Sequence, residues 1–273
     1  MKVLITGHKG FIGQNLVKYI TNNTDWEATG WEWGDSKFPT VGGNDWVIHL
    51  GAISSTTEQD VDKILKQNLE FSQWMHRACK INHVNLQYSS SASVYGLDSN
   101  FKESSTASPC NPYAWSKYLF DRWTQDQETA HNCVVQGFRY FNVYGNYEDH
   151  KGTQASPVTQ FRKQSLEHGK IKLFHNSDQY LRDFIAVEDI CRLHVDFVKV
   201  KESGIWNFGT GKTQSFQDVA NLIANKYNSS IEYIDMPDIL KNSYQKYTCA
   251  DTTKLEATLG NQTFISIQDW LNG

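Results

Sequence analysis

The stretch "KVLITGHKGFIGQNLVKYI", residues 2–20, decides the fold of this chain. Its first part, "KVLITG", is a short β-branched run closed by a glycine, which predicts a buried strand. Its second part carries apolar residues at helical spacing, which predicts an amphipathic helix. Between the two lie Gly7, Gly10 and Gly13 in the spacing G-x-x-G-x-x-G. A strand, a glycine turn and a helix in this order indicate the first unit of a parallel α/β sheet.

The three glycines predict a site for a dinucleotide. Gly7 permits the tight turn, Gly10 lets a pyrophosphate approach the backbone, and Gly13 lets the helix pack close to the strand. The free N–H groups and the positive dipole end of the helix would then face the phosphates. A plain tight turn between strand and helix is the alternative. The strand before and the helix after favour the dinucleotide site.

The second strand bears on the choice of cofactor. We predict it in "WEATGWEW", with Glu32 at its end. An acid there would bond the adenosine ribose and favour NAD, because it repels a 2′-phosphate. Lys37 follows five residues later. It could bind that phosphate and favour NADP, or be an ordinary solvated lysine, so both cofactors stay open.

A unit of the usual dinucleotide-binding sheet is missing after Glu32. Only the twelve residues from Trp33 to Asn44 precede the next buried strand, "DWVIHLGA". A parallel crossover with its own helix and one further strand does not fit into so short a segment. We therefore predict that one strand and one helix are deleted and that the second strand forms an edge of the sheet.

Composition narrows the class of protein. The 273 residues carry a net charge of −4, so there is no basic footprint for nucleic acid. The five cysteines are widely spaced and odd in number, which argues against disulfides and favours a reducing compartment. No apolar run reaches the length of a membrane span. We predict a cytoplasmic protein without a membrane or nucleic-acid partner. The histidines show no ligand spacing, so we also predict no metal.

A possible catalytic pair follows the strand at residues 86–96, "LQYSSSASVYG". "NPYAWSKYLFDRW" predicts a helix from Pro112, on which Tyr113 and Lys117 share one face. A nearby ammonium group favours the phenolate, so we expect Lys117 to lower the pKa of Tyr113 and make it a proton shuttle. Ser91 could hold a substrate hydroxyl beside it. Such a Tyr–Lys spacing is common by chance, and its order after the glycine turn and the serine-rich strand makes it specific.

These motifs resemble a known family. In order, "TGHKGFIG", "HLGA", "YSSSASVYG" and "YAWSK" resemble the extended short-chain dehydrogenase/reductase superfamily. Over essentially the whole chain, further motifs resemble the ADP-glyceromanno-heptose 6-epimerases, which act on a nucleotide sugar of the lipopolysaccharide inner core. The motifs are "GAISSTTE" (51–58), "SKYLFD" (116–121), "GFRYFNVYG" with "HKG" (137–152), "RDF" (182–184), "NFGTGKTQSFQ" (207–217) and "YQKYTCAD" (244–251).

The resemblance implies two acid/base residues, Tyr113 and Lys151. A hydride would leave a carbinol carbon for the cofactor and return to the other face, so the oxygen occupies two different places. Lys117 would tune Tyr113 and bind the nicotinamide ribose, and Ser91 would position the ketone oxygen. The residues alone show only that Lys151 follows a strand end, where open α/β sheets keep their chemistry; otherwise it is a surface lysine. We expect His150 on the surface or behind the site.

Further contacts are implied by the same resemblance. The expected cofactor contacts are Gly7, Gly10, Phe11, Ile12, Gly13, Glu32, Lys37, Leu50, Gly51, Ala52, Asn68, Tyr113 and Lys117. The expected substrate contacts are Ser54, Ser91, Asn142, Arg182 and Tyr244. A guanidinium group suits a diphosphate. The alternative for Arg182 is a structural role beside Asp183.

The expected architecture is α/β: a Rossmann-type, doubly wound parallel sheet with a smaller C-terminal α/β lobe. Residues 1–145 and about 184–210 would bind NAD or NADP tightly. Residues of about 146–183 and 211–273 would bind the nucleotide sugar, in a cleft between the lobes. We expect a homo-oligomer. The alternatives are a UDP-hexose 4-epimerase and a non-catalytic NAD(P)-binding sensor, while Ala92-Ser93 disfavours a 4,6-dehydratase.

Overall fold

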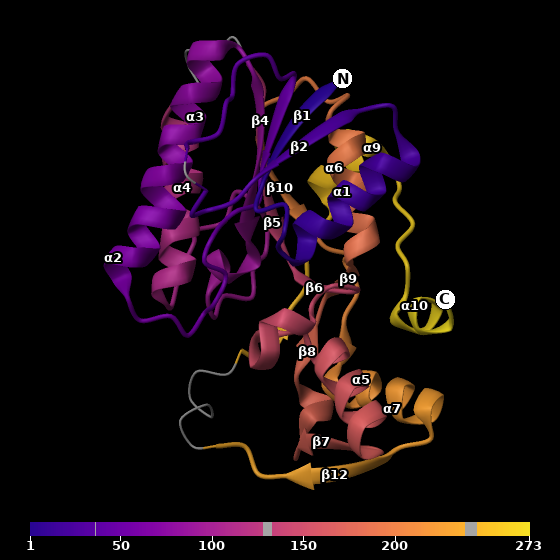
Figure 1. The fold of residues 1–273 in the computed structure, drawn as a ribbon. Coiled ribbons are helices and arrows are strands. Elements are labelled where there is room, and N and C mark those ends of the chain that lie inside the picture. The colour runs from indigo at the N-terminus through magenta and orange to yellow at the C-terminus, as the bar shows by residue number, and fades with distance from the viewer. Residues whose placement is uncertain (36, 128–132, 238–244) are drawn as a thin grey trace.

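The computed structural model describes residues 1–35, 37–127, 133–237 and 245–273. A larger lobe contains the N-terminus and the main sheet, and a smaller lobe follows from the second half of the chain (Figure 1). In the larger lobe, six strands form one parallel sheet in the order β10-β5-β4-β3-β1-β2. Their bounds are β1 (Lys2–Thr6), β2 (Glu27–Trp31), β3 (Trp46–His49), β4 (Asn85–Ser91), β5 (Val135–Tyr140) and β10 (Gly204–Phe208). The doubly wound parallel sheet is confirmed.

The strand β2 lies at one edge of this sheet and pairs only with β1 among the described strands. The described residues between β2 and β3 form neither helix nor strand. The predicted loss of a strand and a helix at this point is therefore confirmed. The chain passes from the edge strand β2 across β1 to β3, and the described residues of this connection include no helix.

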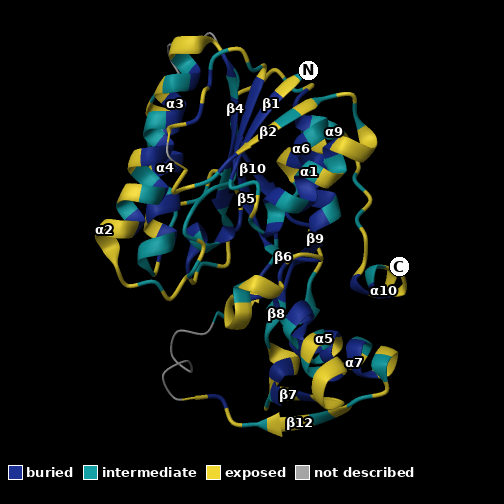
Figure 2. Ribbon diagram, viewed as in Figure 1, coloured by how far each residue is buried: buried dark blue, intermediate teal, exposed yellow. Residues whose placement is uncertain are grey.

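Helices cover both faces of the sheet, which buries its strands (Figures 1 and 2). On one face, α1 (Phe11–Asn23) packs against α6 (Val187–Phe197). On the other face, α3 (Phe71–Asn82) and α4 (Pro112–Asp126) pack over the central strands. The helix α3 continues from α2 (Val61–Ile64) and the π-helical turn η1 (Leu65–Glu70), and the 3₁₀ turn η2 (Ala92–Tyr95) follows β4. The central strands β3 and β5 are buried along their whole length, as expected where helices cover both faces of a parallel sheet, whereas the edge strand β2 is mostly exposed.

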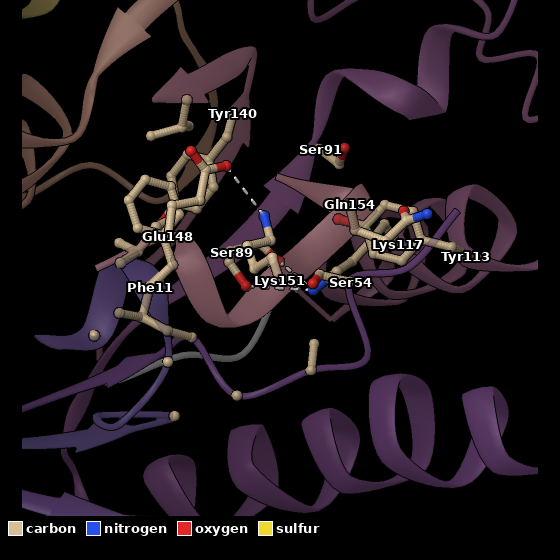
Figure 3. A pocket seen from close by; sticks show the side chains of 18 of the residues that line it. Phe11, Ser54, Ser89, Ser91, Tyr113, Lys117, Tyr140, Glu148, Lys151 and Gln154 are labelled. Atoms are coloured by element: carbon tan, nitrogen blue, oxygen red, sulfur yellow. Dashed lines mark hydrogen bonds and ion pairs between the residues drawn. The ribbon is translucent and has the colours of Figure 1, made fainter. Parts of the chain in front are cut away.

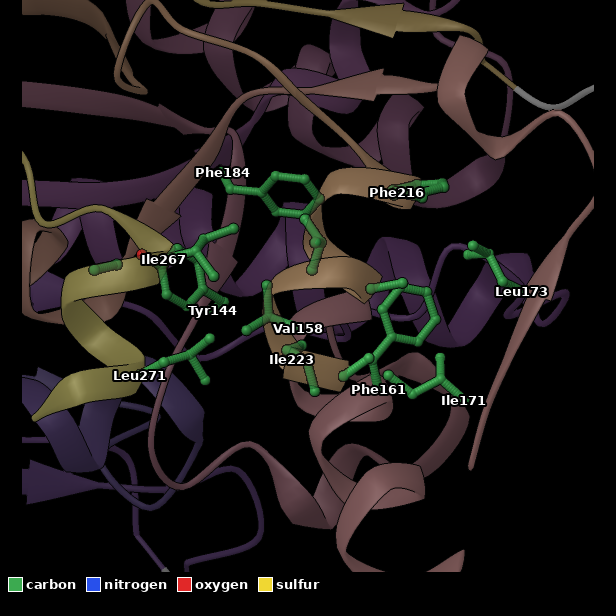
Figure 4. Packing of buried hydrophobic residues seen from close by; sticks show 14 residues of the cluster. Tyr144, Val158, Phe161, Ile171, Leu173, Phe184, Phe216, Ile223, Ile267 and Leu271 are labelled. Atoms are coloured by element: carbon green, nitrogen blue, oxygen red, sulfur yellow. The ribbon is translucent and has the colours of Figure 1, made fainter. Parts of the chain in front are cut away.

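The smaller lobe has its own hydrophobic core (Figure 4). Apolar residues of three helices and of the strands β7, β6 (Asn142–Tyr144) and β9 (Phe184–Ala186) meet there, including Val158, Ile171, Ile223 and Ile267. The elements are α5 (Pro157–His168), β7 (Lys170–Phe174), α7 (Phe216–Tyr227), β12 (Ser230–Ile234) and α10 (Ile267–Asn272). A three-stranded sheet, β11-β8-β13, stands beside them, from β8 (Leu181–Arg182), β11 (Gln214–Ser215) and β13 (Tyr247–Thr248); η5 (Ser177–Gln179) precedes β8.

A pair of short parallel strands joins the two lobes, β6 (Asn142–Tyr144) and β9 (Phe184–Ala186). After β9 the chain returns to the larger lobe, because α6 packs on α1 and β10 pairs with β5. The helix α9 (Thr253–Leu259) also packs against β10, although we placed its residues in the smaller lobe. Between β6 and α5 lies the 3₁₀ segment η4 (Asp149–Gln154), which carries Lys151.

Candidate active site

A pocket of about 550 Å³ opens at the carboxyl ends of the large-sheet strands (Figure 3). Its wall includes the first turn of α1, the ends of β2, β3, β4 and β5, the start of α4, and η4. Residues from both halves of the chain therefore meet in one cavity. Ligands of open α/β sheets bind in this position because the strand ends leave a crevice there.

The glycine corner of the pocket has the shape predicted from its spacing. Gly7 has φ of 72°, and a Cβ atom there would lie 2.6 Å from the backbone nitrogen of Gly51. A Cβ atom at Gly13 would lie 2.1 Å from the carbonyl oxygen of Gly7. Both contacts are too short for a side chain, so the turn and the close approach of α1 require glycine. Gly10 precedes the first helical residue, where the free N–H groups of a helix suit a phosphate.

Glu32 lines this pocket at the end of β2, whereas Lys37 is exposed and is not among the pocket-lining residues. The carboxylate of Glu32 accepts a hydrogen bond of 2.5 Å from the backbone N–H of Lys9. It also lies 3.4 Å from the Nδ1 atom of His8. A carboxylate fixed beside the phosphate turn fits an unphosphorylated adenosine ribose.

Other expected cofactor residues divide into two groups. Phe11, Ile12, Leu50, Gly51 and Ala52 line the pocket. Asn68 does not: it is buried, and its side chain bonds the backbone of Ile53 at 2.8 and 2.9 Å and Ser116 at 3.1 Å. Asn68 therefore holds the loop after β3 against α4, one step behind the pocket wall.

Ser91, Tyr113 and Lys117 all line the pocket. We expected Lys117 to lower the pKa of Tyr113, but burial raises the pKa of Tyr113 above its ordinary value, and a hydrogen bond with Ser91 acts in the opposite direction. The Nζ atom of Lys117 is 6.0 Å from the centre of the Tyr113 ring and donates to the carbonyl oxygen of Ser89 at 2.8 Å. The phenol is therefore protonated in this state, which suits the donation of a proton.

The pKa of Lys117 is itself shifted from its ordinary value. Burial lowers the pKa of Lys117 to about 8, and the charge of Asp121 acts against this fall. Asp121 is one turn further along α4 and forms a buried ion pair with Arg139 at 2.9 Å. A lysine with this pKa can change its charge close to neutral pH.

Lys151 reaches the same pocket from η4, and a quarter of its side chain is exposed. Its Nζ atom lies 3.8 Å from the Oε1 atom of Glu148 and 5.4 Å from the centre of the Phe11 ring (Figure 3). Gly152 follows with φ of 54°, which turns the chain directly after the lysine. Lys151 thus points into the cavity and is not an ordinary surface lysine. His150 lines the pocket beside it.

The expected substrate residues are only partly in the pocket. Ser54 and Asn142 line it. Arg182 is buried in the smaller lobe, where its guanidinium group lies 5.2 Å from the Phe216 ring centre and bonds the carbonyl oxygens of Leu181 and Gln245. It is not among the pocket-lining residues. Tyr244 lies outside the described residues.

Sequence reasoning missed several pocket residues. Glu148, three residues before Lys151, is the most important, because opposite charges three apart can meet on one turn. The aromatic residues Trp31, Trp33 and Phe71 line the end of the pocket near Glu32. Trp31 and Trp33 are the sequence neighbours of Glu32, and this position could have indicated both. Phe71 comes from α3, and only the fold brings it there.

Two other classes of site were sought in the described part of the chain. It contains no group of three or more His, Cys, Asp or Glu side chains able to hold a metal ion. None of its helices is long and apolar enough to cross a membrane.

A glycine turn for phosphates together with Ser91, Tyr113 and Lys117 in one pocket defines a dinucleotide-dependent enzyme. A sequence profile of the NAD dependent epimerase/dehydratase family matches residues 3–209. A curated relative, ADP-L-glycero-D-manno-heptose-6-epimerase of Brachyspira hyodysenteriae, is 36% identical over 97% of this chain and 94% of its own length. This chain belongs to the NAD-dependent epimerase/dehydratase family.

Solved structures share the fold. ADP-L-glycero-D-manno-heptose-6-epimerase of Helicobacter pylori matches 99% of this chain and 94% of its own, with a TM-score of 0.88 and 23% identity. UDP-N-acetylglucosamine 4-epimerase of Methanobrevibacter ruminantium matches 99% of this chain and 97% of its own, with a TM-score of 0.88 and 22% identity. At these identities the structural likeness shows the fold alone.

Proposed function

We propose that the protein converts ADP-D-glycero-D-manno-heptose to ADP-L-glycero-D-manno-heptose, for the heptose of a lipopolysaccharide core. The observation that carries this proposal is the entry of Tyr113 and Lys151 into one pocket from different elements, α4 and η4. An epimerase that works on both faces of a carbinol carbon without rotating its sugar needs a proton donor or acceptor at each of two oxygen positions. The 36% identity to a relative of that name supports the same substrate.

A dinucleotide held at the glycine turn and by Glu32 would supply reversible hydride transfer at the carbinol carbon. In our proposal, one of Tyr113 and Lys151 accepts the hydroxyl proton as the hydride leaves. The other donates a proton to the oxygen in its second position as the hydride returns. The protonated phenol of Tyr113 can donate to an oxyanion, and Ser91 beside it can hold the ketone oxygen by a hydrogen bond. Lys117 would bind the nicotinamide ribose from the same face of α4.

The substrate lies in the cleft between the lobes in this proposal. Ser54 and Asn142 would contact the sugar, because both line the pocket. Arg182 and Tyr244 stay predicted contacts to the diphosphate. The division into a cofactor lobe and a substrate lobe rests on the main sheet carrying the glycine turn and on the separate core of the smaller lobe.

We also propose a cytoplasmic homo-oligomer. All five cysteines are free thiols, which supports a reducing compartment. Trp115 and Leu119 are exposed apolar side chains on α4, which supports the participation of that helix in assembly.

The test is a direct assay. Purified protein with its bound cofactor is incubated with ADP-D-glycero-D-manno-heptose, and the L-glycero epimer is separated and quantified. Tyr113→Phe and Lys151→Ala are each expected to lower the rate by about a hundredfold to ten-thousandfold, the usual contribution of a general acid or base. Lys163→Ala, an exposed lysine in an ion pair on α5, is the matched control and should change little.

The alternatives give different results in the same assay. No heptose conversion, with turnover of a UDP-hexose that survives Lys151→Ala, would replace the proposal by a 4-epimerase that rotates its sugar. Cofactor binding without turnover of either substrate would indicate a sensor.

A further inference from the structure

We propose that Trp33 stacks on the adenine ring of the cofactor and forms the outer wall of the adenine site at the edge of the sheet. The described residues after β2 form no strand and helix that would extend the sheet beyond it, so this wall must come from side chains near the edge strand. Adenine presents two flat faces that an aromatic ring can cover.

Aromatic rings gather at this edge. Trp31 stacks on Phe71 with ring centres 4.8 Å apart, and Phe71 stacks on Trp74 at 5.6 Å. The ring centres of Phe38 and Trp74 are 4.8 Å apart. The ring of Trp33 is nearly perpendicular to those of Trp31 and Phe71, with ring centres 6.4 Å and 5.3 Å away. The cluster packs the edge strand β2 and the loop after it against α3.

Only some of these rings are available to a ligand. Trp31, Trp33 and Phe71 line the pocket. Trp31 is 9% exposed and Phe71 is 4% exposed, and Phe71 is sandwiched between two other rings. Trp33 is 45% exposed, so of these three pocket-lining rings it is the one with a free surface. A base that enters this end of the pocket would meet the ring of Trp33.

The position of Trp33 along the pocket fits the base and not the ribose or phosphates. The phosphates belong at the turn of Gly7 and Gly10, and the ribose belongs at Glu32. Trp33 is the next residue beyond Glu32, as the base is the next group beyond the ribose. A turn keeps the two residues in place: Asp35 donates its N–H to the carbonyl oxygen of Glu32 at 3.1 Å and accepts the Glu32 N–H at 2.9 Å.

The test compares ligands that contain adenine with one that does not. Binding of NAD, ADP-ribose and nicotinamide mononucleotide to the full chain is measured by calorimetry for the native protein, Trp33→Ala, Trp33→Phe and Phe38→Ala. We expect Trp33→Ala to lower the affinity for NAD and for ADP-ribose by about tenfold. The affinity for nicotinamide mononucleotide should stay within about twofold of that of the native protein. Trp33→Phe should retain most of the affinity. Phe38 is a more exposed ring of the same cluster outside the pocket, so Phe38→Ala should bind like the native protein.

Fluorescence gives a second readout that is independent of affinity. Stacking on adenine should quench the emission of Trp33, so saturation with ADP-ribose should quench the native protein more than Trp33→Phe. Two results would overturn the proposal. One is an unchanged affinity for ADP-ribose in Trp33→Ala. The other is an equal loss of affinity for ADP-ribose and for nicotinamide mononucleotide in Trp33→Ala, because this would indicate general damage to the fold.

Discussion

The Nζ atom of Lys151 lies 3.8 Å from the Oε1 atom of Glu148, and that carboxylate is itself held by three further hydrogen bonds. Ser156 donates both its N–H and its hydroxyl group to Glu148, each at 2.7 Å, and Thr159 donates its hydroxyl group at 2.6 Å. Ser156 is the N-cap of α5. The carboxylate therefore couples the start of α5 to the lysine and keeps the lysine directed into the pocket.

Removing the charge of Glu148 should impair the reaction more than binding. In Glu148→Gln the amide oxygen can still accept the Ser156 N–H, and the amide NH₂ group can donate to the Ser156 hydroxyl oxygen, while the attraction on Lys151 is lost. We expect kcat to fall between about tenfold and a hundredfold, with KM within about threefold, because a small displacement of a reacting group slows chemistry strongly. Steady-state kinetics of heptose epimerisation measure both constants. The control is Glu167→Gln, which removes an exposed partner of Lys163 on α5. Equal effects of the two substitutions would contradict a positioning role for Glu148.

Glu32 should favour NAD over NADP. Its carboxylate is next to the phosphate turn, and a 2′-phosphate would add negative charge beside it. We expect Glu32→Gln to weaken NAD binding and to narrow the preference for NAD over NADP by about fivefold or more. Dissociation constants for both dinucleotides test this. Glu27→Gln, an exposed acid on the same strand, is the control. If the ratio of the two constants does not change in Glu32→Gln, the acid does not determine cofactor choice.

The low pKa of Lys117 predicts a dependence of stability on pH. Burial lowers this pKa to about 8 in the folded protein, whereas an unfolded lysine titrates near 10.5. Between these values the unfolded chain binds more protons, so the contribution of Lys117 to stability rises as pH increases from 8 to 10.5. Relative to Lys117→Met, the native protein should gain up to about 3 kcal/mol over this range. Urea unfolding of both cofactor-free proteins at several pH values measures the difference. A difference that is constant with pH would refute the shift.

The ion pair of Asp121 and Arg139 should be important for stability. Both side chains are buried, and Asp121 also accepts hydrogen bonds from Tyr88 and Ser90 at 3.1 and 3.0 Å. Asp121→Asn leaves the guanidinium charge buried without a partner charge, which should cost about 3–5 kcal/mol. Urea denaturation measures this loss. Asp126→Asn, in an exposed pair with Arg122 on the same helix, should have little effect. If Asp121→Asn lowers the free energy of unfolding as little as Asp126→Asn does, burial does not make the ion pair important.

Much of the fold could be predicted because its signals are local. The glycine spacing after β1 requires a turn that only glycine can adopt, and the twelve residues from Trp33 to Asn44 are too few for a further strand and its crossover helix. Chain length and backbone geometry alone therefore indicated both the dinucleotide turn and the edge position of β2. The return of the chain to the larger lobe at about residues 184–210 stays a prediction, and it is supported by the packing of α6 on α1 and the pairing of β10 with β5.

The candidate site could be predicted only in part. Ser91, Tyr113 and Lys117 were found because their order along the chain is characteristic, and the structure places all three in the pocket. The expected lowering of the Tyr113 pKa by Lys117 was wrong, because burial raises this pKa and the opposing influence is a hydrogen bond with Ser91. Asn68 was expected in the pocket but holds the wall from behind. Burial depends on neighbours from distant segments, and residue spacing carries no information about them.

The sequence by itself determined the dinucleotide turn, the deleted unit and the identity of the acid/base candidates, because these depend on backbone geometry and on the order of residues along the chain. Only the tertiary structure decided which side chains share the pocket. It set Glu148 beside Lys151 and joined that carboxylate to the start of α5, and it packed Phe71 of α3 against Trp31 of β2, leaving Trp33 exposed. Such contacts join segments far apart in the chain, and their strength depends on packing and on exclusion of water, which exist only in the folded protein.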